Sequence, residues 1–238
     1  MTLLVALALI AYNNVLNLWP PFNGPLYVPL NLTLATILGL LALGPLDLDA
    51  AALSVGGPWP VALLGGLGAA ALITAPLFLA ARSDRWRSKI ADRRVVHLRG
   101  GALVYQTLVR IPLGTALLEE FAFRGVLFGA WMERGALTAA LLSSIAFGLW
   151  HISPTLNQVR ANDPGAGLRK KAAAVAGTVV FTTAAGLLLC WLRESSGTIA
   201  LPFALHAGVN SFATLAAVQA GRSAKDLQRG GDQGGGIT

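Results

Sequence analysis

The chain has 238 residues, of which 55% are hydrophobic and only 12% are charged, and its formal net charge is +7. An ordinary soluble domain carries roughly 25% charged residues, so this composition excludes a typical soluble enzyme and indicates an integral membrane protein. The single cysteine, Cys190, excludes an intrachain disulfide and a cysteine-based metal cluster.

The hydrophobic stretches predict an all-α fold, a polytopic membrane helix bundle. A helix needs about 20 apolar residues to cross a hydrocarbon core of roughly 30 Å. Seven stretches qualify, and an eighth would be added if Gly101–Arg110 formed part of a longer or broken helix. In chain order the seven are Thr2–Trp19, Pro29–Leu46, Trp59–Ala81, Ile111–Trp131, Ala136–Ile152, Ala172–Leu192 and Thr198–Val218. We expect them to form one integral membrane domain over residues 1–220.

The basic residues predict how the bundle is oriented. Seven lie in residues 82–99, four in 160–171 and three in 222–229. With seven spans these segments share one side, and the other side keeps only Arg134 and Arg193. This is the positive-inside pattern, so the charge indicates topology in lipid rather than nucleic-acid binding. We expect the N-terminus outside and the C-terminus in the cytoplasm.

The last residues and the overall composition allow two further predictions. Residues 221–238 are polar and glycine-rich, with too little apolar surface to fold alone, and are predicted to be a flexible cytoplasmic tail. The abundance of Ala, Gly, Leu and Arg is typical of a GC-rich bacterial genome. We therefore expect a multi-pass protein of a bacterial inner membrane.

Two glutamates and an arginine interrupt the fourth apolar stretch, in the sequence "ALLEEFAFRG" (116–125). An ionisable side chain in the bilayer costs about 2.5–3.5 kcal/mol on insertion scales and usually faces a cavity or a partner. Glu120 and Arg124 are four residues apart and can pair on one helical face, whereas Glu119 is rotated by about 100°. The pattern predicts one structural ion pair and one spare carboxylate, suited to a general base. The alternative is a charge cluster that only braces the helices.

Two later segments bring further polar side chains into predicted spans. "SSIAFGLWHISP" (143–154) ends its apolar run on His151, and "ALPFALHAGVNSF" (200–212) places His206 and Asn210 four apart on one helical face. A lone membrane histidine is more often packed and hydrogen-bonded than catalytic. Two histidines, an asparagine and a spare glutamate on three spans favour a shared site.

These residues form three motifs that resemble those of the CPBP family, the type II CAAX prenyl endopeptidases and Abi-type intramembrane proteases. The motifs are, in chain order, Glu119-Glu120-x-x-x-Arg124, Phe147-x-x-x-His151 and His206-x-x-x-Asn210. The resemblance covers about residues 111–212 and implies peptide-bond hydrolysis inside the membrane. The first three predicted spans have no counterpart in it.

The resemblance also implies a role for each residue. Glu119 would be the base that activates water, with His151 helping to hold or deprotonate it. His206 and Asn210 would donate hydrogen bonds to the oxyanion, a contribution of about 2.7–4 kcal/mol per donor. Glu120 and Arg124 would support the site, and Arg124 could also contact the substrate.

A metal site is the alternative chemistry. Glu119, His151 and His206 could hold zinc with an open fourth position, although the usual helical H-E-x-x-H arrangement is absent. We expect a glutamate-type mechanism without a cofactor. The competing function is a non-catalytic scaffold, immunity or transporter-like protein that binds an ion or partner, but we find no inverted repeat typical of transporters. Prenylated tails, leader peptides and membrane-anchored sorting tails all remain open as substrates.

Overall fold

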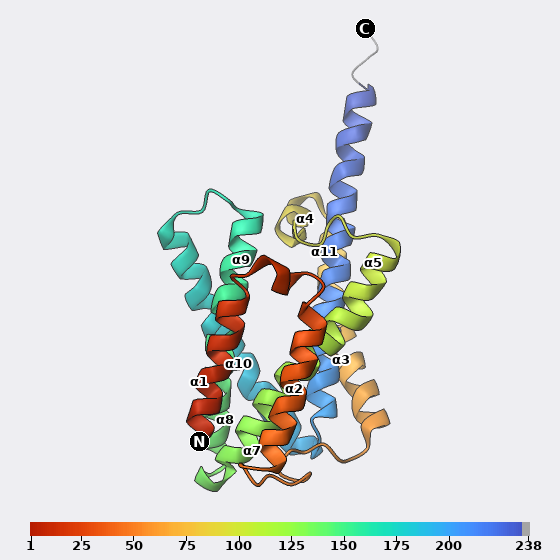
Figure 1. Ribbon diagram of the computed structural model, residues 1–238. Coiled ribbons are helices and arrows are strands. Elements are labelled where there is room, and N and C mark those ends of the chain that lie inside the picture. The colour runs from red at the N-terminus through yellow and green to blue at the C-terminus, as the bar shows by residue number, and fades with distance from the viewer. Residues whose placement is uncertain (235–238) are drawn as a thin grey trace.

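The computed structural model describes residues 1–234, with side chains for all of these except Pro20 and residues 223–234. Every regular element in this part of the chain is a helix, and no strand occurs in it, so the predicted all-α fold is confirmed (Figure 1). The N-terminal third contains α1 (Thr2–Leu16), η1 (Pro20–Asn23), α2 (Tyr27–Leu43), α3 (Trp59–Arg82) and α4 (Asp84–Ile90).

The middle of the chain forms one long helical rod built from short segments of different winding. These are α5 (Gly100–Tyr105), η2 (Gln106–Ala116), α6 (Leu117–Glu119), η3 (Glu120–Leu127), α7 (Phe128–Trp131) and η4 (Met132–Arg134). The helices that follow are α8 (Ala136–Trp150), α9 (Ile152–Asn162), α10 (Leu168–Ser196) and α11 (Ala200–Gly234).

Five helical stretches are long and apolar enough to cross a membrane by length and composition. They are Trp59–Arg82, Gly100–Arg134, Ala136–Asn162, Leu168–Ser196 and Ala200–Arg222. Two shorter apolar helices, α1 of 15 residues and α2 of 17, correspond to the first two predicted spans. The segment 101–110 is the beginning of the fourth span and does not form an eighth.

The two ends of the bundle differ in charge. The beginning of α4, the α9–α10 connection and the C-terminal part of α11 lie at one end, whereas the N-terminus, the α2–α3 connection and α7 lie at the other (Figure 1). The first end therefore carries the basic segments 82–99 and 160–171. Helix α11 continues to Gly234, into the predicted tail, whose residues 235–238 lie outside the described part. The flexibility of the tail and the sidedness of the bundle stay predictions.

Thiol labelling tests this sidedness. Arg94 and Asp47 are both exposed. They belong to the α4–α5 and α2–α3 connections, which lie at opposite ends of the bundle (Figure 1). We expect a membrane-impermeant thiol reagent to label Arg94→Cys only from the cytoplasm and Asp47→Cys only from the other side. Cys190 is 1% exposed and should stay unlabelled in both variants. Labelling with the two sides exchanged would overturn the predicted topology.

Small residues allow two pairs of helices to approach closely. In the α3–α11 pair, a Cβ added to Gly66 would lie 2.6 Å from the Cβ of Ala204, and one added to Gly208 would lie 2.6 Å from the Cβ of Ala70. In the α8–α10 pair, a Cβ on Gly186 would lie 2.9 Å from the Ser144 side chain. Such contacts replace the hydrophobic effect as the cohesive force between helices in lipid.

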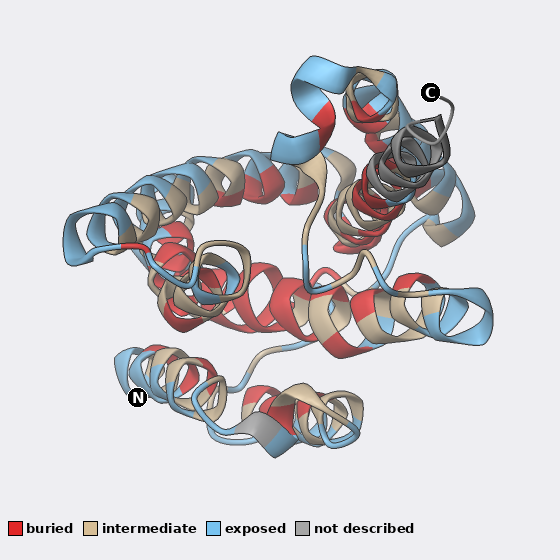
Figure 2. Ribbon diagram, turned by 90° about the horizontal axis from the view of Figure 1, so that it is seen from above, coloured by how far each residue is buried: buried red, intermediate tan, exposed pale blue. Residues whose placement is uncertain are grey.

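The buried residues lie where the helices pack against one another. Buried residues occupy the helix faces that turn toward one another, and exposed residues face outward (Figure 2). Many of the exposed residues on α3 and α10 are large and apolar, among them Leu64, Leu72, Phe181 and Trp191. An outward apolar surface of this kind suits contact with lipid.

The rod from Gly100 to Arg134 carries the acidic motif and contains two π-helical segments. Both η2 and η3 are π-helical, with hydrogen bonds that close one residue later than in an α-helix. Pro112 lies within η2 and cannot donate to an i→i−4 bond. Glu119 is the last residue of α6, and Glu120 is the first of η3. Such π-helical segments frequently mark functional sites.

Candidate active site

Five of the six polar residues singled out in the sequence meet between four elements. Glu119 and Glu120 lie at the junction of α6 and η3, and Arg124 follows in η3. His151 lies at the break between α8 and α9, and His206 lies in α11. The helix bundle therefore brings together residues that are up to 87 positions apart in the chain.

Glu120 is held by two partners. Arg124 Nη1 donates to Glu120 Oε1 at 3.1 Å, and His206 Nδ1 lies 2.7 Å from the same oxygen. Glu120 and Arg124 are 1% and 0% exposed, so the predicted ion pair is present and fully buried. The Arg124 guanidinium also lies over the ring of Phe147, 4.1 Å from its centroid. These contacts fix the positions of Glu120 and Arg124 within the bundle.

Glu119 has one bound oxygen and one free oxygen. The indole N–H of Trp150 donates to Glu119 Oε1 at 3.0 Å. Glu119 Oε2 is buried without a hydrogen-bond partner among the described residues. It lies 3.9 Å from His151 Nε2 and 3.7 Å from His206 Nε2. These separations are too long for direct hydrogen bonds.

The hydrogen bonds of the two imidazoles indicate where their protons lie. His151 Nδ1 lies 2.7 Å from the carbonyl oxygen of Phe147, which can only accept, so Nδ1 carries the hydrogen. A neutral His151 then presents the lone pair of Nε2 toward Glu119. His206 Nδ1 faces a carboxylate that is already paired with Arg124, so this nitrogen also carries a hydrogen.

Asn210 is the one predicted site residue that no contact ties to the others. It is half-buried on α11, four residues beyond His206. Its side chain makes no hydrogen bond to any residue in the described part of the chain, and only its backbone carbonyl accepts, from Thr214 at 2.8 Å. A role for Asn210 at the oxyanion stays a prediction.

Trp150 is the site residue that the sequence analysis did not single out. It directly precedes His151 and is 2% exposed. Neighbouring residues on an α-helix diverge by about 100°, so a tryptophan next to a site histidine is not expected to face the same group. The break in the helix at this point allows both side chains to reach Glu119.

The proposed zinc alternative can be tested against these distances. A tetrahedral zinc with bonds of about 2.0–2.1 Å would hold its ligand atoms about 3.4 Å apart. The two histidine nitrogens lie 3.7 and 3.9 Å from Glu119 Oε2, slightly farther than zinc ligands, and no three His, Cys, Asp or Glu side chains among the described side chains of residues 1–222 are arranged to hold a metal ion. Zinc stays an alternative for experiment.

Comparison with known proteins relates part of the chain to a protein family. Residues 101–212 match the family model described as "Type II CAAX prenyl endopeptidase Rce1-like". This match confirms the resemblance of the three motifs to CPBP intramembrane proteases over residues 101–212. With its apolar helices, the chain is a multi-pass membrane protein, and its matched segment is similar to CAAX-type proteases. Comparisons with curated proteins and with solved structures gave no significant match.

Proposed function

We propose that the chain hydrolyses a peptide bond in a membrane-embedded or membrane-proximal substrate, with Glu119 as the general base. The observation that carries the proposal is the unpartnered Glu119 Oε2, which faces a ring nitrogen of both histidines at 3.7 and 3.9 Å. A buried carboxylate oxygen without a partner is costly. Glu120 Oε2 is also unpartnered, but only Glu119 Oε2 faces a ring nitrogen of both histidines, which favours a function for Glu119. Water is the smallest group that could bridge these atoms.

In the proposed reaction, water donates one hydrogen to Glu119 Oε2 and the other to His151 Nε2. Glu119 takes a proton as the water oxygen attacks the substrate carbonyl carbon, and later delivers that proton to the departing amine. Trp150 supports this role, because its N–H occupies Oε1 and leaves Oε2 for the water. His151 supports it through the lone pair that its bond to Phe147 leaves on Nε2.

His206 is proposed to stabilise the oxyanion as a cation. With both ring nitrogens protonated, it donates to Glu120 through Nδ1 and presents Nε2–H to the site. Glu119 and Glu120 would then be balanced by Arg124 and His206, which suits a poorly hydrated interior. Donors that are fixed before the reaction act most strongly where water is excluded. Asn210 is proposed as a second donor that engages only when substrate is bound.

Cleavage assays with and without a strong chelator test this mechanism. We expect purified protein in detergent to cleave at least one peptide among prenylated tails, leader peptides and membrane-anchored sorting tails, and to keep its rate in chelator. Loss of activity in chelator and its return with added zinc would replace the glutamate-type mechanism by metal-assisted hydrolysis. Failure to cleave every peptide class would favour a non-catalytic role, to be followed by a search for bound partners.

A further inference from the structure

The break that presents His151 leaves two backbone carbonyls without their helical partners. Helix α8 ends at Trp150, and α9 begins at Ile152. In a continuous helix the Trp150 carbonyl would accept from residue 154, but Pro154 has no N–H to donate. The N–H of Ser153 would donate to the Leu149 carbonyl, but in this structure it donates elsewhere. Buried backbone groups of this kind require other partners.

Two neighbouring asparagines of α1 supply these partners. Asn13 Nδ2 donates to the Trp150 carbonyl at 2.7 Å. Asn14 Nδ2 donates to the Leu149 carbonyl at 3.0 Å, and Asn14 Oδ1 accepts from the Ser153 N–H at 2.7 Å. The Asn14 amide therefore lies between the two groups that would otherwise bond to each other. Insertion of a side chain into the i→i−4 ladder is a recognised cause of helix kinks.

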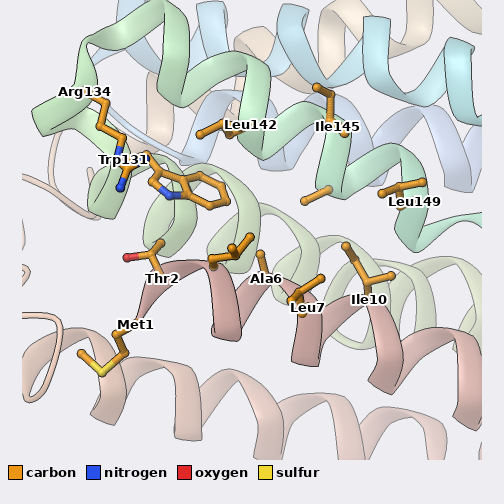
Figure 3. Close-up of a pocket in the computed structure, with 12 residues that line it drawn as sticks. Met1, Thr2, Ala6, Leu7, Ile10, Trp131, Arg134, Leu142, Ile145 and Leu149 are labelled. Atoms are coloured by element: carbon orange, nitrogen blue, oxygen red, sulfur yellow. The ribbon is translucent and has the colours of Figure 1, made fainter.

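Helices α1 and α8 also share apolar contacts, because Ala6 and Leu9 of α1 are buried in the same core as Ala146 of α8. Toward the N-terminus of α1, an apolar cavity of about 430 Å³ lies beside this contact (Figure 3). Its lining includes Leu7 and Ile10 of α1, and Leu142 and Ile145 of α8. The asparagine contacts lie beyond this cavity, beside the break. They form the polar attachment of α1 to the break.

A stacked ring contact lies beside the same attachment. Tyr12 and Trp150 have ring centroids 6.3 Å apart and nearly parallel planes. Tyr12 also donates to Asn31 of α2 at 2.8 Å, and Asn31 Nδ2 donates to the Gly114 carbonyl in η2 at 2.6 Å. Helix α1 therefore contacts both the ring that binds Glu119 and, through α2, the rod that carries Glu119.

We propose that Asn13 and Asn14 are positioning residues of the site: they hold the α8–α9 break open so that Trp150 and His151 both reach Glu119. The inference rests on the proposed function. It extends that function to a helix outside the matched segment 101–212. Without the amides, Ser153 can return its N–H to Leu149, and the turn that carries His151 shifts, although Pro154 still leaves the Trp150 carbonyl without a helical partner.

Histidine spectra of the purified protein test the geometry without any substrate. The chain has only three histidines, so ¹⁵N-histidine labelling gives three sets of ring signals in detergent. We expect Asn13→Leu and Asn14→Leu to shift the signals of His151 and to leave those of His97, in the exposed basic segment, unchanged. Unshifted His151 signals in both variants would overturn the proposal.

Kinetics on any peptide that the wild type cleaves provide the second readout. A misplacement of about 1 Å can cost about 10²-fold in rate, so we expect kcat to fall by about that factor in both variants while KM stays close to the wild-type value. Wild-type kcat in both variants would count against positioning. If the wild type cleaves nothing, the proposed function fails, and the histidine spectra still decide whether the asparagines hold the break.

A matched control is present at the same interface. Asn157 Nδ2 on α9 donates to the Asn17 carbonyl of α1 at 2.8 Å, away from the break. We expect Asn157→Leu to lower the melting temperature, because it also loses a hydrogen bond at this interface, with unchanged His151 signals and kcat. Equal spectral and kinetic effects in this control would reduce Asn13 and Asn14 to a merely structural role.

A milder substitution keeps the test decisive if the leucine variants do not fold. Asn14→Asp retains the shape of the side chain and an acceptor for the Ser153 N–H, but it loses the donor to Leu149. We expect shifted His151 signals and a lower kcat in this variant. Wild-type spectra and kinetics would overturn the role of Asn14.

Discussion

Replacing Glu119 by glutamine is expected to lower peptide cleavage by about 10²–10⁴-fold, the range that general acid–base groups contribute. Glutamine retains the shape of the side chain and an oxygen for the Trp150 N–H, but it cannot take a proton from water. The loss should therefore appear in kcat, while the protein still inserts and melts like the wild type. Single-substrate kinetics together with a thermal melt in detergent measure both quantities.

Glu133→Gln is the matched control for this experiment. Glu133 is exposed at the opposite end of the rod from α5, in η4, and removal of its charge should leave cleavage unchanged. Full activity in Glu119→Gln would remove Glu119 as the base. An equal loss in both variants would indicate a general effect of the substitution on the purified protein.

Arg124→Ala is expected to have the largest effect on stability, a loss of about 3–5 kcal/mol in the free energy of unfolding. The substitution leaves the Glu120 carboxylate buried beside His206 alone, and it removes a side chain that is 0% exposed and packed on Phe147. We expect a lower melting temperature together with lost cleavage. A melting temperature equal to that of the wild type would refute the structural ion pair.

Two further variants distinguish the effect of breaking the buried pair from the general effect of removing a charge. Lys170 pairs with Asp163 at an exposed site, with side chains 67% and 42% exposed, and Lys170→Ala should leave the melting temperature unchanged. The double variant Glu120→Gln/Arg124→Met leaves neither partner as an unpaired charge. Its melting temperature should be higher than that of Arg124→Ala, because the penalty for a broken buried pair comes mainly from the charge left without a partner.

The sequence was sufficient for the helical character of the apolar stretches and for the ion pair, because both depend on local spacing. Each of the seven apolar stretches is helical, and the i, i+4 spacing of Glu120 and Arg124 produces the expected contact. The extent of the fourth span was not predictable, because residues 101–110 carry Arg110 and Gln106 and have too weak an apolar signal. In the structure Arg110 donates to the Asn23 carbonyl and lies over the Tyr27 ring.

The details of the site depend on contacts between distant segments, which spacing does not encode. The bond from the Trp150 indole to Glu119 requires the break at His151, and Pro154 alone does not predict such a break within the first turn of a helix. The polar run Asn13–Asn14 interrupted the first apolar stretch, but nothing in the sequence identified its partners. The π-helical winding on both sides of Glu119 likewise has no signal beyond Pro112.

The glycine contacts between α3 and α11 and between α8 and α10 bear on how a substrate of the proposed reaction would reach Glu119. A contact between long side chains can widen when those side chains change rotamer, on the nanosecond timescale of exposed residues. Gly66 and Gly186 have no side chain that could swing aside. At these two contacts, sideways entry from lipid would therefore require movement of a whole helix.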